Sequence, residues 1–215
     1  MEILEPAKSG MKGRWILNSK LKLIIGSLLL TSVVALTAVI AKPQADEKRG
    51  PMFTKEGELV LPTGYRSWVF IGGPITPNGL NDGDAPFPEF HDVYIEKENF
   101  RYYQKNGKFP EGTVMVKELA LVQGSGHSDG SIDSASGRGY FPGSLNGLDV
   151  MVKDAKRFGK TNDWGFFTFG HHIPPYEPTA KESSSKECAS CHIAFVAKTD
   201  MVWVQYYPLL KTNIE

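Results

Sequence analysis

The chain has 215 residues and balances 24 basic against 24 acidic side chains, so it carries no formal net charge at neutral pH. Beyond the first 41 residues the balance is 19 basic to 22 acidic, which argues against nucleic acid as a partner. The remaining length suits a single domain. The 22 Gly and 14 Pro of the chain indicate many turns and short strands.

The N-terminal segment predicts export from the cytoplasm. Residues 1–22 contain five basic and two acidic side chains, and the apolar run LIIGSLLLTSVVALTAVIA follows over residues 23–41. This run is long for a signal peptide and just long enough to span a bilayer. Residues 1–41 are therefore expected to be a cleaved signal peptide or an N-terminal membrane anchor. In both cases the rest of the chain lies in the periplasm, soluble or anchored through residues 23–41.

Residues 42–56 are polar and predict a linker into one domain, residues 57–215. Aromatic and β-branched residues concentrate there in short runs between Gly and Pro clusters, which predicts strands. The runs are residues 66–71, 90–95, 113–122 and 164–169, and residues 147–158 are compatible with a strand followed by a turn.

Two helices and one long loop are expected between or after these strands. Residues 96–106 fit a short helix that ends at Gly107, and residues 186–195 fit a second helix near the C-terminus. The run GSGHSDGSIDSASGRG (residues 124–139) is small and polar and predicts a structureless, mobile loop with a solvated His127. The fold class is α+β, mainly β.

The two cysteines of the chain, Cys188 and Cys191, form a C-x-x-C-H motif with His192. On one helical turn, this spacing is typical of covalent haem attachment: the thiols bind one haem, and the imidazole binds its iron. A thioredoxin-like redox pair would follow the first strand of a βαβ unit, and a zinc site would need a second pair of ligands. The sequence has neither pattern, so the expected cofactor is one haem c per chain.

A sixth protein ligand to the iron is not expected. Met201 lies nine residues after His192, too near in sequence to reach the opposite face of the haem easily. Met115 and Met151 lie in strand-like apolar surroundings and are expected to fill the core. A five-coordinate haem with one open face binds small molecules.

With these elements assigned, the chain resembles the cytochrome P460 family from about residue 53 to residue 210. Long ordered stretches carry the resemblance, among them GELVLPTGYRSWVFIG, GYFPGSLNGLDVMVKDAKRF and ECASCH. The resemblance implies a mainly antiparallel β-sheet fold with a few helices, one c-type haem and a homodimer. It also implies a relationship to the β-sheet cytochromes c′, which share the fold and bind gases.

The resemblance further implies a covalent bond between a lysine amine and a meso carbon of the porphyrin. The matching lysine, in the stretch TVMVKEL, is Lys117. Strand alternation places Lys117 on one face with Met115, Leu119 and Leu121. The alternative is a lysine whose stem packs on the sheet while its ammonium reaches solvent.

Two positions in the implied distal pocket differ from those of the family's well-known hydroxylamine-oxidising members. Asp149 stands where they have Glu, and its carboxylate reaches about 1.5 Å less far. His91 stands where they have Arg, so its charge would depend on pH. Asp149 is expected to relay protons, with His91 as the next candidate; the alternatives are an ordinary turn or strand-edge aspartate and a solvent-facing histidine. His171 and His172 are expected to form a loop near the haem edge.

The sequence and the resemblance together imply a haem enzyme that oxidises hydroxylamine, and/or nitric oxide, toward nitrous oxide. Its electrons would leave one at a time to a soluble acceptor such as a cytochrome c. The alternative is a cytochrome c′-like protein that binds or scavenges nitric oxide, or transfers electrons, without hydroxylamine turnover.

Overall fold

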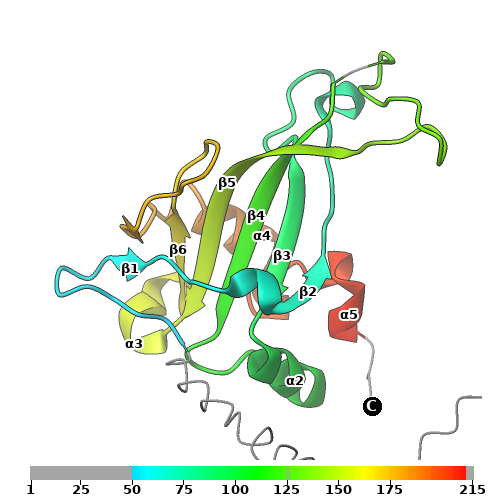
Figure 1. The fold of residues 1–215 in the computed structure, drawn as a ribbon. Coiled ribbons are helices and arrows are strands. Elements are labelled where there is room, and N and C mark those ends of the chain that lie inside the picture. The colour runs from blue at the N-terminus through cyan, green and yellow to red at the C-terminus, as the bar shows by residue number, and fades with distance from the viewer. Residues whose placement is uncertain (1–49, 125, 212–215) are drawn as a thin grey trace, which may run out of the picture. The chain divides into compact units, whose positions relative to one another are not determined.

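The computed structural model describes residues 50–124 and 126–211. Within these ranges a five-stranded antiparallel sheet has the order β2-β3-β4-β5-β6, so each strand pairs with its neighbour in sequence (Figure 1). A second, two-stranded antiparallel sheet joins β1 to β7. The strands are β1 (Leu59–Val60), β2 (Val69–Gly72), β3 (Phe90–Ile95), β4 (Val114–Val122), β5 (Pro142–Lys153), β6 (Trp164–Thr168) and β7 (Thr179–Ala180).

Short helices connect and follow these strands. The α-helices are α2 (Lys97–Asn106), α3 (Ala155–Phe158), α4 (Ala189–Val196) and α5 (Pro208–Lys211). Single 3₁₀ turns cover Tyr65–Ser67, Asn78–Leu80, Gly159–Thr161, Ala197–Thr199 and Val204–Tyr206. The predicted mainly antiparallel β fold with a few helices is confirmed.

Helix α2 shows how local sequence sets an element boundary. It ends where the sequence predicts, because Gly107 adopts a left-handed φ of 65° that residues with a Cβ rarely adopt. Helix α4 begins three residues later than predicted, so Cys188 immediately precedes its first turn.

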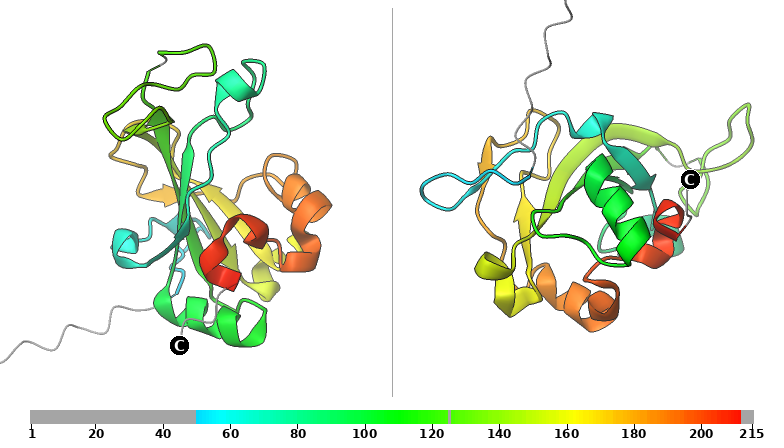
Figure 2. Two further views of the ribbon diagram at one scale, coloured as in Figure 1. Left: turned by 90° about the vertical axis from the view of Figure 1, so that its right-hand side faces the viewer. Right: turned by 90° about the horizontal axis from the view of Figure 1, so that it is seen from below.

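The large sheet separates two apolar layers. On β4, Met115 faces a layer that α4 and α5 cover, while Val114 and Val116 face a layer that includes β1 and β7. Figure 2 shows α4 and α5 on one side of the sheet and β1 on the other. Each buried valine contributes roughly 1.5–3 kcal/mol through removal of apolar surface from water. The candidate site residues lie on the α4 side.

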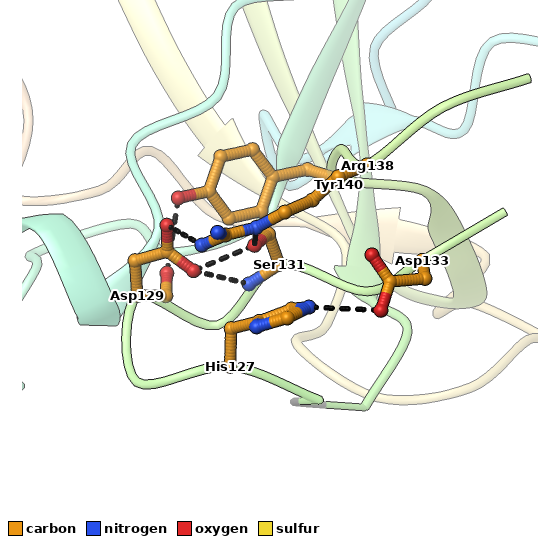
Figure 3. Close-up of polar contacts among 6 residues, drawn as sticks. All are labelled: His127, Asp129, Ser131, Asp133, Arg138 and Tyr140. Atoms are coloured by element: carbon orange, nitrogen blue, oxygen red, sulfur yellow. Dashed lines mark hydrogen bonds and ion pairs between the residues drawn. The ribbon is translucent and has the colours of Figure 1, made fainter.

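Two long segments, residues 73–89 and 126–141, extend beyond the same end of the sheet (Figures 1 and 2). The second includes most of the loop predicted over residues 124–139, whose described residues form no helix or strand but are held by their own polar contacts. Asp129 accepts hydrogen bonds from Arg138 and from the backbone N–H and hydroxyl of Ser131, and the Tyr140 hydroxyl donates to the Asp129 carbonyl (Figure 3). In this loop, hydrogen bonds between short polar side chains and nearby backbone groups stabilise the chain where no helix or strand forms.

His127, which was expected to be solvated in this loop, is partly exposed. Its Nε2 is 3.1 Å from Asp133 Oδ2 (Figure 3). The pair remains at the surface, since the Asp133 side chain is largely exposed. His127 therefore belongs to the loop's own polar network.

The predicted signal peptide or anchor, including residues 23–41, lies outside the described residues. Among the helices that the structure does describe, none is long and apolar enough to cross a membrane. Part of the predicted linker packs on the domain: the Val60 N–H donates to the Met52 carbonyl at 2.8 Å, and the Phe53 ring contacts Phe158 and Phe167. The folded domain thus includes residues that precede residue 57.

Candidate haem-binding site

The C-x-x-C-H motif lies at the start of α4, the helix that packs against β6. Cys188 is half-buried and Cys191 is exposed, and both are free thiols. With His192 they follow the three- and four-residue spacing that places side chains on one helix face. Burial raises the pKa of the Cys188 thiol, and the charges of Asp149 and Lys117 also act on it. The thiols are therefore accessible near the Lys117 side of the sheet.

His192 is prepared to bind a metal through its Nε2 atom. Its Nδ1 lies 2.7 Å from the Met201 carbonyl oxygen, which can only accept, so Nδ1 carries the proton and donates. This leaves the Nε2 lone pair free. Burial lowers the pKa of His192, which favours the neutral imidazole that iron requires. The Phe166 ring packs 4.7 Å from the imidazole and helps to hold its plane.

Met201 contacts the motif through its backbone and not through its sulfur. Its side chain is fully buried in the core layer on the α4 side. The Asn162 amide donates to the Met201 sulfur at 3.5 Å. Thus Met201 is a core residue whose carbonyl orients His192.

On the sheet, Lys117 of β4 lies directly opposite Asp149 of β5. Lys117 Nζ is 2.9 Å from Asp149 Oδ2, and the two side chains are 27% and 21% exposed. The ammonium also lies 4.3 Å from the centre of the Phe87 ring, a cation–π distance. The Lys117 ammonium therefore ends in a half-buried polar cluster, not alone in solvent.

Asp149 lies in the middle of β5, not in a turn, and has two further partners. The Thr168 hydroxyl donates to Asp149 Oδ1 at 2.9 Å, and His171 Nε2 lies 3.1 Å from the same oxygen. Burial by itself raises the pKa of Asp149, but the hydrogen bond from His171 and the charge of Lys117 outweigh burial and hold it well below its usual range. The carboxylate is therefore ionised. We call Lys117, Asp149, Thr168 and His171 the Lys117 cluster.

His91 is half-buried and not fully solvent-facing, and its charge changes below neutral pH. Its Nε2 is buried and has no hydrogen-bond partner in the described part of the chain. Burial, and then the charge of Lys117, lower the pKa of His91 to about 4. The Phe87 and His91 rings pack edge to face, with centroids 5.9 Å apart. A neutral imidazole with an orphaned buried nitrogen suits a site that receives a small polar ligand.

The lowered pKa of His91 predicts acid destabilisation. Between about pH 6.5 and 4 the unfolded chain protonates this histidine and the folded protein does not, so stability falls as pH falls, by at most roughly 3 kcal/mol. We expect His91→Gln to remove this part of the pH dependence in denaturant unfolding of the haem-loaded protein. His127→Gln serves as the control. Equal acid sensitivity in both variants would contradict the prediction.

The sequence identified His91, Lys117, Asp149 and the haem motif but not the roles of Thr168 and His171. Thr168 pairs opposite Asp149 in the register of β5 and β6. Alternation along β6 places Thr168 on the same face of the sheet as Phe166. The sequence pattern could therefore have indicated that Thr168 lies at the site. No local pattern indicates that His171, in the loop after β6, turns back to Asp149.

These residues fit a covalently attached haem: two thiols and a neutral histidine with a free Nε2 lie near a paired Lys117 and near His91, whose Nε2 has no partner among the described residues. The family model described as Cytochrome P460 matches residues 62–204, a range that contains all of these residues. A search of curated proteins found no match. Because the family match covers well over half of the sequence, the chain belongs to the cytochrome P460 family, which implies a c-type haem cofactor.

Proposed function

We propose that this protein oxidises hydroxylamine to nitrous oxide at its c-type haem, with nitric oxide as a further ligand or substrate. The observation that carries the proposal is the ionised Asp149 between Lys117 and His171, close to the haem motif. Conversion of two hydroxylamine molecules to one nitrous oxide and one water releases four protons and four electrons. A site for this reaction therefore needs a proton acceptor with a route to solvent.

Different residues of the chain have different roles in this proposal. Cys188 and Cys191 would hold the haem through thioethers, and His192 would bind the iron through Nε2. The haem supplies one-electron redox chemistry when bound. His91, which stays neutral, can hydrogen-bond a bound nitrogen or oxygen atom through its orphaned Nε2.

Asp149 would take protons from the substrate and pass them to His171, whose side chain is 47% exposed and reaches solvent. A carboxylate whose pKa is held low by the His171 hydrogen bond and the Lys117 charge is a weak base. A covalent bond from Lys117 to the porphyrin would remove the ammonium charge beside Asp149. We therefore propose that this cross-link both modifies the haem and raises the pKa of Asp149 toward a useful range.

A second candidate is reversible binding of nitric oxide without turnover, as in the cytochromes c′. The observation that favours it is the neutral, desolvated His91 at a position where the well-known hydroxylamine-oxidising members have a cation. A neutral imidazole beside the iron suits an uncharged diatomic ligand. This candidate needs neither the cross-link nor proton relay through Asp149.

The experiment that separates the two uses the haem-loaded protein. Hydroxylamine and a one-electron acceptor are added without oxygen, nitrous oxide is measured by gas chromatography, and the optical spectrum of the reduced protein is recorded. Nitrous oxide formation together with a red-shifted band would support the enzyme. A normal c-type spectrum and nitric oxide binding without nitrous oxide would support the binding protein.

The route through His171 predicts a distinct pH dependence. The hydrogen bond to Asp149 raises the pKa of His171, with Lys117 and Glu89 as the other charged groups that act on it. The imidazole can accept a proton only above that pKa, so the rate ratio of the unmodified protein to His171→Gln should rise with pH, above about 6.5, to the order of 10²-fold. The ratio cancels the protonation of hydroxylamine itself. A ratio that stays flat would exclude His171 from the proton route.

We further propose that the protein works in the periplasm, either soluble or held to the membrane through residues 23–41. Support comes from the basic and apolar N-terminal sequence and from the export that covalent haem attachment requires. The resemblance to the family supports a homodimer and a soluble acceptor such as a cytochrome c.

A further inference from the structure

After α4 and the 3₁₀ turn Ala197–Thr199, the chain reverses sharply at Asp200 and Met201. Both residues adopt left-handed backbone conformations, with φ of 53° and 64°. Two consecutive non-glycine residues in this region are uncommon and cost free energy, so the surrounding structure must hold them. The Met201 N–H donates to the Val196 carbonyl at 3.0 Å, and the reversal directs the Met201 carbonyl to His192 Nδ1.

The Asp200 carboxylate ties this reversal to the sheet. It accepts from the Phe109 N–H at 2.9 Å, from the Trp164 indole N–H at 3.1 Å and from Lys153 Nζ at 2.6 and 2.8 Å. Lys153 ends β5, Trp164 begins β6, and Phe109 lies in the loop after α2. The Lys153 and Asp200 side chains are only 12% and 19% exposed, so little water competes with these bonds.

We propose that Asp200 is a positioning residue that sets the reduction potential of the haem iron through the Met201 carbonyl and His192. A firmly held carbonyl that accepts from Nδ1–H increases the electron density on Nε2. Stronger donation by the axial ligand stabilises ferric over ferrous iron and lowers the potential. The inference rests on His192 as the iron ligand, which is part of the proposed function.

The first variant is Asp200→Asn. Asparagine tolerates the left-handed backbone conformation, so the chain reversal at residue 200 can still form. Its amide has one accepting oxygen, and its NH₂ group cannot accept from Phe109 or Trp164, so one anchor and the ion pair to Lys153 are lost. In the haem-loaded protein we expect a positive shift of the midpoint potential. The iron–histidine stretching frequency of the ferrous protein, measured by resonance Raman, should fall.

The matched variant is Lys153→Met, which separates anchoring from charge. Removal of a nearby positive charge alone favours ferric iron and lowers the potential. If the chain reversal at Asp200 is held less firmly, the Met201 carbonyl accepts less strongly from His192. The reduction potential then rises and the iron–histidine frequency falls. We therefore expect both variants to shift the potential upward and the frequency downward, even though they change the net charge in opposite directions.

Lys153→Met leaves the bonds from Phe109 and Trp164 to Asp200 in place, so it carries the test if Asp200→Asn does not fold. Potentials that move in opposite directions, or frequencies that stay unchanged, would overturn the inference and leave Asp200 as a structural anchor. Neither measurement depends on hydroxylamine turnover. An unmodified protein without an iron–histidine band would instead overturn the assignment of His192, and this inference with it.

Discussion

Asp149→Asn is expected to slow nitrous oxide formation from hydroxylamine by about 10²–10⁴-fold, the usual loss when a general acid–base is removed. The amide cannot take a proton, although its oxygen can still accept from Thr168 and His171, which both bond Asp149 Oδ1. The fold of β5 should therefore persist. Steady-state rates with the haem-loaded protein provide the measurement.

Asp149 contacts Lys117 directly, so the state of the cross-link must be known before rates are compared. Intact-mass spectrometry of each variant provides this control. Asp149→Glu keeps the charge and lengthens the side chain, and it should raise the rate or leave it level. If neither substitution alters turnover in protein with equal cross-linking, Asp149 has only a structural role and the proton route lies elsewhere, with His91 next.

Lys117→Arg is expected to abolish the red-shifted band of the reduced protein. Arginine keeps the positive charge that pairs with Asp149 and lies near Phe87, but a guanidinium does not form the bond to the porphyrin that a lysine amine forms. Haem should stay attached through Cys188 and Cys191. The spectrum should then be that of an ordinary c-type haem with one histidine ligand.

Peptide mapping provides the direct test of the Lys117 bond. In the unmodified protein the haem should be found on peptides from both residues 113–122 and residues 187–192, and in Lys117→Arg only on the second. Lys181→Arg, at an exposed position, is the matched control and should resemble the unmodified protein. A free Lys117 peptide from fully loaded unmodified protein would place the chain with the cytochromes c′.

Much of the fold could be predicted because its signals are local. Aromatic and β-branched runs between Gly and Pro clusters marked the central strands, and the start and end of β3 agree with prediction. The loop at residues 126–141 could not be predicted from composition. Its order depends on contacts such as that of Arg138 with Asp129, between residues that are close in space only after the chain folds back.

The sequence by itself determined the haem chemistry of this protein, because the two thiols and the histidine act at fixed spacing on one helical turn. The resemblance to the family indicated Lys117 and Asp149 as residues of the haem site. Only the tertiary structure decided what surrounds them. Strand register paired Lys117 with Asp149, burial made His91 neutral, and chain reversals brought His171 to Asp149 and the Met201 carbonyl to His192. Charge state and tautomer depend on neighbours in space, and long-range packing sets those neighbours.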